Sequence, residues 1–315
     1  MPPAHKTGWP WTEESSQLPD LMPNGRPWPR ISIVTPSYNQ GQFIEETIRS
    51  VLLQGYPNLE YIVIDGASND GSAEIIAKYG RWLAHWISEP DRGQSHAINK
   101  GFRHASGEVM AWINSDDVYT PGALSEVVSA VEDSRGAATN WNGWLIGRTL
   151  YWNLITNEKK ELSPDNPPDD KLDLLRWRCP QRSSFWGRTC WSHAGPLRED
   201  LHFIFDTEFF LKLVFLGYKP DLLEKVLAVG RLHENCKTLA QADRWGSEGL
   251  MMYDRLADFL SPQDRRRVRQ AVRADRARVR YHQARADGRW LSAVLAATGI
   301  LRYSPPWRKQ EGLPF

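Results

Sequence analysis

The stretch MAWINSDD, residues 110–117, passes from apolar residues into a polar turn that ends in two adjacent carboxylates. A carboxylate pair at the end of a strand suits Mg²⁺ or Mn²⁺, because these cations take oxygen ligands and share them with substrate phosphates. The same two aspartates could instead cap the helix that we expect to begin near Gly122. Three motifs upstream of this stretch favour the metal-binding interpretation.

Strand-like and helix-like segments alternate upstream of this stretch. Buried apolar runs predict strands, and spacings of three and four residues predict helices between them. This alternation predicts an α/β fold with a mostly parallel central sheet flanked by helices. The expected strands are 31–35, 61–64, 86–88 and 108–113, and the expected helices are 43–52, 73–79 and 94–104.

Polar residues follow directly after each of the expected strands. They are Tyr38, Asp65, Asp91 and Asp116. Ligands of parallel sheets bind at the carboxyl ends of the strands, and these ends meet along one edge. We therefore expect these four side chains to gather at one ligand site.

The second half of the chain is less regular. We expect strands at 144–152, 183–186 and 226–229, a helix at 205–216, and a polar loop at 157–171. The pattern is helical from residue 244 onward. The predicted division is an irregular arm at 1–29, a central domain at 30–240 and a helical, arginine-rich extension at 241–315.

Composition excludes some functions. The 315 residues carry 39 basic and 38 acidic side chains, so a net charge of +1 gives no reason to expect a nucleic-acid partner. Three cysteines without metal-ligand spacing fit a reducing, cytoplasmic setting. No apolar core typical of a signal peptide is visible near the N-terminus, and no run is long enough for a membrane span.

The charge is concentrated in the extension. Between Asp264 and Arg289 there are ten arginines and three aspartates, a local excess of seven positive charges. This segment could be a solvated helix with many ion pairs or a surface that docks a partner. It could also contact an anionic membrane through residues 262–301, where apolar residues such as Trp290 and Leu291 follow the arginines. We favour peripheral membrane association.

Four ordered blocks carry a resemblance to a known family: TPSYN (35–39), DGASNDGS (65–72), DRGQSHAINKG (91–101) and NSDD (114–117). Together they resemble family 2 glycosyltransferases, nucleotide-sugar-dependent enzymes of the GT-A fold. The likeness covers residues 31 to about 122 and continues more loosely from 181 to 238. It implies that residues 30–122 bind the nucleotide sugar and that 123–240 form the acceptor side.

The resemblance also implies which residues hold the donor. Pro36, Tyr38, Asn39 and Asp65 would bind the base, and an acceptor carboxylate at Asp65 suits the imide N–H of uracil or thymine. Without the resemblance, Tyr38 could be an ordinary half-buried aromatic residue and Asp65 a turn residue before Gly66. Three further residues would lie beside the ribose and diphosphate: Asp91, Gly93 and Asn99.

NSDD stands where the family carries an Asp-any-Asp signature, with Asn114 in place of the first aspartate. The resemblance implies that Asp116 binds Mn²⁺ or Mg²⁺, which would stabilise the departing diphosphate. Asp117 would be a second ligand or a contact to the ribose or sugar. After the last strand, His233 could reach the metal or diphosphate, and Arg231 could pair with phosphate oxygens.

A direct-displacement transferase needs a general base for the acceptor hydroxyl. The segment FDTEF, residues 205–209, matches the family's acidic cluster except that Phe205 replaces a glutamate. We assign the base to Asp206, with Glu208 as the alternative, although Asp-Thr-Glu also suits a helix N-cap. Gln181 and Trp186 lie in a segment that borders the acceptor pocket in the family.

These inferences predict a metal-dependent, inverting glycosyltransferase of the hexosyl or hexosaminyl class. It would transfer a sugar from a UDP- or dTDP-sugar to a glycan or lipid-linked acceptor in surface polysaccharide biosynthesis, at the inner face of the membrane. A nucleotidylyltransferase would carry a Gly-rich, basic loop after the first strand, and PSYNQ (36–40) is not one. A non-catalytic nucleotide-sugar-binding module or scaffold remains the alternative.

Overall fold

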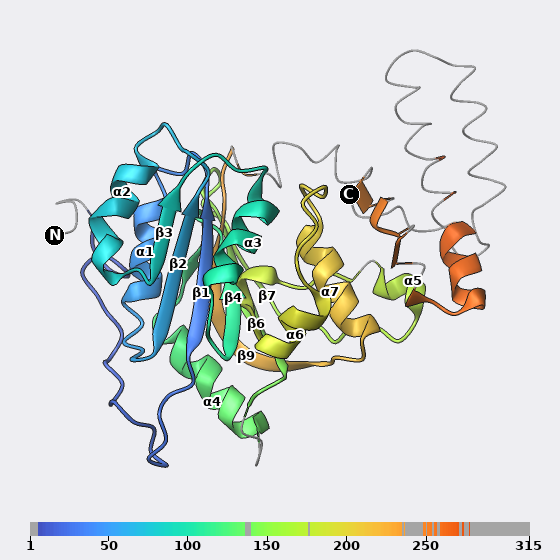
Figure 1. Ribbon diagram of the computed structural model, residues 1–315, viewed down its shortest axis with the longest axis horizontal. Helices are drawn as coiled ribbons and strands as arrows, with labels where there is room; N and C mark the ends of the chain where they lie inside the picture. The colour runs from blue at the N-terminus through green and yellow to red at the C-terminus, as the bar shows by residue number, and fades with distance from the viewer. Residues whose placement is uncertain are drawn as a thin grey trace. The chain divides into compact units, whose positions relative to one another are not determined.

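The computed structural model describes residues 6–135, 140–175, 177–234 and 236, and parts of the segment from 248 to 277. The chain forms two compact units. The first comprises Met1–Asn166 and Arg178–Glu234, and the second comprises Pro167–Trp177 and Asn235–Phe315. The predicted arm at 1–29 therefore belongs to the first unit, which carries the sheet (Figure 1).

The first unit is built on one mixed sheet with the strand order β3-β2-β1-β4-β8-β6-β9-β5, and β7 pairs with β6. The four strands from β3 to β4 are parallel, as the alternating pattern predicted. β8 is antiparallel to both β4 and β6, which mixes the second half of the sheet. The strands are β1 (Ile31–Ser37), β2 (Leu59–Asp65), β3 (His85–Ser88), β4 (Val109–Trp112), β5 (Val118–Tyr119), β6 (Trp144–Asn153), β7 (Lys159–Leu162), β8 (Ser184–Gly187) and β9 (Pro220–Leu232).

Helices cover both faces of the sheet, as Figure 1 shows. Their apolar residues recur at helical spacing, so each helix presents one apolar stripe to the strands. The α/β fold expected from the sequence is confirmed. The helices are α1 (Ile44–Leu52), α2 (Ser72–Tyr79), α3 (Gln94–His104), α4 (Ala123–Arg135), α6 (Arg188–Ala194) and α7 (Phe205–Phe215) in the first unit and α5 (Lys171–Leu174) in the second.

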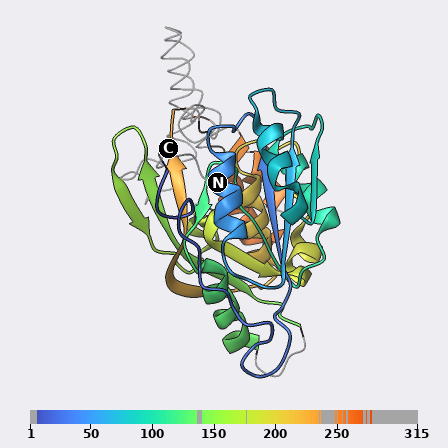
Figure 2. The ribbon, with the colours of Figure 1, turned by 90° about the vertical axis from the view of Figure 1, so that its left-hand side faces the viewer.

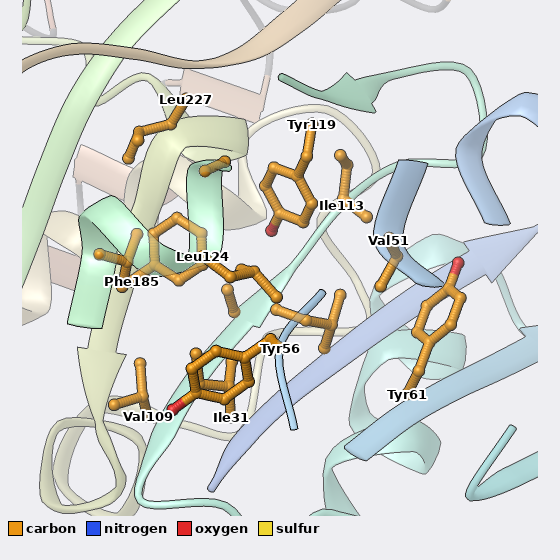
Figure 3. Close-up of a cluster of buried hydrophobic side chains, with 14 of the residues drawn as sticks. Ile31, Val51, Tyr56, Tyr61, Val109, Ile113, Tyr119, Leu124, Phe185 and Leu227 are labelled. Atoms are coloured by element: carbon orange, nitrogen blue, oxygen red, sulfur yellow. The ribbon is translucent and has the colours of Figure 1, made fainter. Parts of the chain in front are cut away.

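Alternate residues of the strands supply the two cores. Ile31 of β1 and Val109 of β4 pack with side chains of α1, α2 and α4 in one buried cluster (Figure 3). On the opposite face, α3 approaches β1 so closely that a Cβ at Gly101 would lie 2.4 Å from Val34 Cγ1. Successive side chains of a strand point to opposite faces of the sheet, so each strand contributes to the core on both faces.

An aromatic cluster fills the second face between β4, β8 and α7. Trp112 lies 5.1 Å from Trp186 and 6.0 Å from Phe209, measured between ring centroids. Phe210 stacks on Trp112 at 6.1 Å with an interplanar angle of 15°. The cluster fixes α7, and with it Asp206, against the strand that leads into NSDD.

Replacing Phe209 with alanine is expected to destabilise the fold by about 3–5 kcal/mol, because this fully buried ring contacts four other aromatic rings. Urea unfolding followed by tryptophan fluorescence would measure the loss. Leu216→Ala is a suitable control, since Leu216 is 44% exposed just after α7 and its loss should cost less than about 1 kcal/mol. A loss of less than about 1 kcal/mol for Phe209→Ala would contradict this account of the cluster.

The N-terminal arm has no helix or strand between residues 6 and 29 and is well anchored. Trp9 Nε1 donates to the carbonyl oxygen of Tyr119 at 2.8 Å, and Arg49 of α1 donates to the carbonyls of Pro10 and Trp11. Arg26 pairs with Glu132 of α4, and Figure 2 shows the arm in dark blue passing beside this helix. The arm therefore ties α1, β5 and α4 together.

Four elements differ from the sequence prediction. β7 lies inside the expected loop at 157–171. All four of its residues are exposed, and its KKEL sequence lacks the alternation of apolar and polar residues that predicts a strand. β9 is much longer than the predicted strand at 226–229. The prediction missed its full length because register shifts against β6, near Gly147 and Arg148, interrupt the alternation of buried and exposed residues. β5 has only two residues and α6 only seven, so neither gives a clear periodic signal.

In the second unit, the helical pattern is present where residues are described. Residues 262–270 are helical, Val268 is buried, and Arg267 pairs with Asp170 at 3.0 Å. All of the arginines after residue 273 lie outside the described residues, as do Trp290 and Leu291. Among the described residues, no helix has the length and hydropathy needed to cross a membrane.

Candidate functional site

Tyr38, Asp65 and Asp91 meet at one edge of the sheet. β1 and β2 are in register up to the pair Ser37 and Asp65, and β3 ends opposite Asp65 at Ser88. A Cβ at Gly66 would lie 2.8 Å from Asp91 Oδ2 and 3.3 Å from Tyr38 Cδ2, so these side chains surround the Gly66 backbone. The parallel strands thus gather three of the predicted residues, and NSDD follows β4 in the same sheet.

The Tyr38 side chain lies on the surface at this edge of the sheet, and Tyr38 is 61% exposed. Pro36 is buried within β1. Asn39 adopts a positive φ of 52°, its Oδ1 accepts the N–H of Asn69 at 3.0 Å, and its own N–H donates to Ser68 Oγ at 2.8 Å. Asn39 therefore joins the turn after β1 to the turn after β2, and Tyr38 offers the free face for a planar ligand.

Asp65 is completely buried, and its carboxylate has three donors. The N–H of Ser68 donates at 2.9 Å, Ser68 Oγ at 2.6 Å and Ser88 Oγ at 2.7 Å. An ionised carboxylate has about four acceptor positions, so these three bonds use most of them, and burial separates the carboxylate from solvent. In this structure Asp65 chiefly shapes the turn that any bound base would touch.

The turn at residues 91–93 and helix α3 bind the loop at 195–200. Asp91 Oδ1 accepts the N–H of Gly93 at 2.7 Å. Asn99 is buried, with its Nδ2 donating to the carbonyl of Leu197 at 2.8 Å and its Oδ1 accepting the N–H of Leu197 at 2.9 Å. The amide predicted to orient the ribose or diphosphate is therefore committed to this loop. Arg92 pairs with Glu199 of the same loop through Nε at 3.0 Å.

Asp116 and His233 lie together although 117 residues separate them. His233 Nε2 is 3.2 Å from Asp116 Oδ2, and the His233 ring packs on Phe43 at 4.4 Å between centroids. Asp116 side-chain atoms retain 20% exposure, so the pair is reachable from solvent. His233 Nδ1 is buried and has no hydrogen-bond partner in the described structure.

These two side chains fit a divalent cation. Neighbouring ligands of an octahedral Mg²⁺ or Mn²⁺ lie about 3 Å apart, since each bond is about 2.1 Å long, and the observed separation of 3.2 Å is close to this. No group of three metal-binding side chains occurs among the described residues. A cation at Asp116 and His233 would therefore take further ligands from substrate oxygens and water.

Asp117 points into the protein. Only 1% of Asp117 is exposed, and its carboxylate accepts Arg182 Nε at 2.8 Å and the N–H of Arg231 at 3.2 Å. Burial raises the pKa of Asp117 above its usual value, and Arg182 opposes this rise. Asp117 was predicted to be a second metal ligand or a contact to the ribose or sugar. The structure instead gives it an internal ion pair with Arg182, in the turn before β8, and a hydrogen bond from the backbone of β9.

Arg231 is also internal. Its Nε donates to the carbonyl of Asp116, its Nη1 to Glu46 at 2.8 Å, and its Nη2 to Thr47 Oγ1 at 3.3 Å. Thr47 Oγ1 in turn donates to the carbonyls of Ser115 and Asp117. All three guanidinium nitrogens thus have protein acceptors and only 3% of the side chain is exposed, which differs from the phosphate pairing expected from the sequence.

Asp206 is the second residue of α7, whereas the cap position is Ile204 and makes no side-chain cap bond. Its Oδ1 accepts the N–H of Thr207 at 2.6 Å. Burial raises the pKa of Asp206 above its usual value, and the nearby positive charges of Arg178 and Arg182 act in the opposite direction. A partly buried carboxylate with a raised pKa has the properties of a general base.

Glu208 occupies a different environment. It is only 4% exposed, and its Oε1 pairs with Lys212 Nζ at 2.9 Å one turn along α7. Burial raises the pKa of Glu208 as well. Because Lys212 already holds this carboxylate, Asp206 is the better placed of the two candidate bases.

The two predicted acceptor residues are buried. Gln181 Nε2 donates to the carbonyl of Trp112 at 2.7 Å, which joins β4 to the turn before β8. Trp186 is completely buried in the aromatic cluster. Both side chains therefore pack against Trp112 of β4, which leads into NSDD, and neither presents an exposed surface to an acceptor.

Sequence reasoning gave no role to Arg182, which pairs with Asp117, or to Gln94, whose Nε2 donates to Asn114 Oδ1 at 2.7 Å. Both residues lie within motifs that were recognised. Gln94 lies one residue from Gly93, and Arg182 lies beside Gln181. The sequence signal for Arg182 was its position between Gln181, assigned to the acceptor pocket, and the strand expected at 183–186.

A family model described as "Glycosyl transferase family 2" matches residues 32–191. Among curated proteins, an uncharacterized glycosyltransferase of Mycobacterium tuberculosis is 33% identical over 186 residues, which are 58% of this chain and 68% of that protein. The glycosyltransferase TuaG of Bacillus subtilis, named for teichuronic acid biosynthesis, is 33% identical over 121 residues. That match covers 38% of this chain and 48% of TuaG.

Solved structures share the fold at low identity. TarS of S. aureus, residues 1–349 with UDP-GlcNAc, matches with a TM-score of 0.57 and 14% identity over 88% of this chain and 82% of that one. The mannosyltransferase PcManGT of Pyrobaculum calidifontis, solved with GDP-Man and Mn²⁺, matches with a TM-score of 0.54 and 22% identity. Its match covers 94% of this chain and 86% of PcManGT.

Proposed function

Because the chain belongs to glycosyl transferase family 2, we propose that this glycosyltransferase moves a hexosyl or hexosaminyl group from a nucleoside-diphosphate sugar to an acceptor hydroxyl, with inversion. The observation that carries the proposal is the Asp116–His233 pair, which joins the turn after β4 to the residue after β9 in the same sheet as the Tyr38 edge. The Asp116–His233 pair would hold the diphosphate of the donor, and the Tyr38 edge would hold its nucleotide base.

The donor side would use the polar turns at the strand ends. Tyr38 offers an exposed ring for stacking on a base, and the bonds of Asn39 and Asp65 keep the turns beneath it rigid. A UDP- or dTDP-sugar is the favoured donor, because the family likeness assigns Asp65 to the base. Since its carboxylate is fully buried, Asp65 would act by shaping the turn beneath Tyr38. Gly93, with a φ of 117°, brings the backbone at the start of α3 close to the site.

For the chemical step we assign the base to Asp206. The acceptor oxygen would attack the anomeric carbon, Asp206 would take the hydroxyl proton, and the bond to the diphosphate would break. Mn²⁺ or Mg²⁺ held by Asp116 and His233 would supply positive charge to the diphosphate. Arg231 and Thr47 would keep the NSDD turn in place through its backbone carbonyls.

The acceptor would be a glycan or lipid-linked intermediate of surface polysaccharide biosynthesis. Support comes from the likeness to TuaG, a glycosyltransferase named for teichuronic acid biosynthesis. A cytoplasmic location with peripheral contact to an anionic membrane remains a prediction. Most of residues 262–301, which would make that contact, lie outside the described residues.

Calorimetric titration of the full chain with UDP, GDP, dTDP and CMP, each with and without Mn²⁺, is expected to show metal-dependent binding of UDP or dTDP. The reason is that diphosphate oxygens would complete the coordination begun by Asp116 and His233. Release of the same nucleotide from its sugar donor would then report turnover. Binding of none of the four nucleotides would refute the proposed function, and binding without a Mn²⁺ effect would remove the metal from it.

A further inference from the structure

Arg182 is held in a fixed position at the base of the site. Its Nε donates to Asp117 Oδ2 at 2.8 Å, and its Cζ lies 4.8 Å from the centre of the Tyr151 ring. On another side lies Gly230, where an added Cβ would come within 2.8 Å of Arg182 Cζ and 3.0 Å of its Nη1. Because glycine has no side chain, position 230 leaves the space that the guanidinium occupies.

The outer nitrogens of Arg182 differ from those of Arg231. All three guanidinium nitrogens of Arg231 have protein acceptors. Arg182 uses only Nε, and its Nη1 and Nη2 have no protein acceptor within the described part of the chain. The Arg182 side chain retains 16% exposure, whereas Arg231 retains 3%. Arg182 thus has donors that a ligand can reach.

The surroundings of Arg182 indicate which part of a ligand it would meet. Its charge acts on the carboxylates of Asp117 and Asp116 and also on that of Asp206. The scissile bond of the donor would lie between a metal-binding Asp116 and a basic Asp206. The phosphate nearest to that bond is the terminal phosphate of the nucleoside diphosphate.

We propose that Arg182 binds the terminal phosphate of the leaving nucleoside diphosphate through Nη1 and Nη2, while Asp117, Tyr151 and Gly230 hold the guanidinium in place. The inference rests on the proposed function and names the phosphate-binding arginine of that site. A guanidinium donates two parallel hydrogen bonds to phosphate oxygens, which a lysine ammonium cannot reproduce.

The first test compares UDP and UMP binding, in the presence of Mn²⁺, for the wild-type protein and Arg182→Lys. If the wild-type protein prefers guanine nucleotides, GDP and GMP replace them. Lysine keeps a positive charge beside the buried Asp117. We expect the variant to bind the diphosphate about 10- to 100-fold more weakly, and the monophosphate within about twofold of wild type.

The second variant, Gly230→Ala, leaves Arg182 in the chain but displaces its guanidinium, because the new methyl group would occupy the same space. It should reproduce the selective loss of diphosphate affinity. Gly249→Ala is the matched control, since nothing lies within 4 Å of an added Cβ there and its diphosphate affinity should not change.

The outcomes separate the two levels of the proposal. If the wild-type protein binds no nucleoside diphosphate, the proposed function fails and this inference with it. If wild type binds UDP and both variants bind it equally well, only the role of Arg182 is refuted. Equal losses of UDP and UMP would also refute it, because they would indicate a general distortion of the site. The same holds for a loss confined to the acceptor KM.

Discussion

Replacement of Asp206 with asparagine is expected to lower kcat by about 10²- to 10⁴-fold and to leave the affinity for the nucleoside diphosphate unchanged. Asparagine keeps the oxygen that accepts the Thr207 N–H, so the first turn of α7 should persist. It cannot take a proton from the acceptor hydroxyl. Initial rates of sugar transfer, together with calorimetric titration of the donor nucleotide, would separate the loss of chemistry from a loss of binding.

The pH dependence of kcat gives a second readout for the same variant. Burial raises the pKa of Asp206, and only the deprotonated carboxylate acts as a base. Activity of the wild-type protein should therefore fall as the pH drops through this raised pKa. The Asp206→Asn variant should lack that acid limb, because its residual activity no longer depends on a carboxylate at this position.

Two other variants serve as a control and as a test of the alternative base. Asp221→Asn makes the same change at an exposed position of β9 and should leave kcat unchanged. Glu208→Gln tests the alternative base. If Glu208→Gln lowers kcat more than Asp206→Asn does, Glu208 is the base in spite of its ion pair with Lys212. If turnover is unchanged in both variants, neither Asp206 nor Glu208 is the base. If the wild-type protein binds the donor nucleotide but transfers no sugar, a non-catalytic binding module becomes the better account of the chain.

The sequence predicts the parallel half of the fold well for a physical reason. β1, β2 and β4 are largely buried on both faces, so their apolar runs are unambiguous, and α3 begins and ends at the predicted residues 94 and 104. Parallel strands align their carboxyl ends. The placement of Tyr38, Asp65 and Asp91 at one edge therefore follows from topology alone.

The second half could not be predicted to the same degree. β7 has a fully exposed, charged sequence that resembles a loop, and it exists because β6 supplies hydrogen bonds along its edge. Its pairing with β6 depends on a partner strand, which no local pattern encodes. The bounds of β9 were missed for a similar reason, since the register shifts against β6 break its alternation.

Side-chain roles within the motifs were the least predictable feature. Family likeness places Asn99, Asp117 and Arg231 near the ligand, but the structure uses each of them for internal hydrogen bonds. A motif identifies the residues around a site without showing which of them still have free donors or acceptors. That distinction depends on partners distant in sequence, such as Leu197 for Asn99 and Glu46 for Arg231.

Replacement of Asp116 with asparagine is expected to weaken Mn²⁺-dependent binding of the nucleoside diphosphate by more than about 100-fold. Loss of a residue that merely orients a metal ligand typically costs about 10- to 100-fold in metal affinity, so loss of a charged ligand should cost more. The backbone carbonyl at position 116 would still accept Arg231 Nε, so the turn should be retained. Titration of the nucleotide with and without Mn²⁺, together with thermal unfolding, would measure both effects.

The choice of asparagine makes this test specific for the metal. The amide oxygen introduced by Asp116→Asn could still accept a hydrogen bond from His233, which lies 3.2 Å from the carboxylate in the wild-type protein, so the main change is the lost charge. Asp133→Asn, at an exposed position of α4, removes one negative charge away from NSDD and should keep the full Mn²⁺ effect. A Mn²⁺ effect that survived in Asp116→Asn would place the cation elsewhere. Because Asp117 is buried and paired with Arg182, no second carboxylate of NSDD is free to replace Asp116, and the loss should be nearly complete.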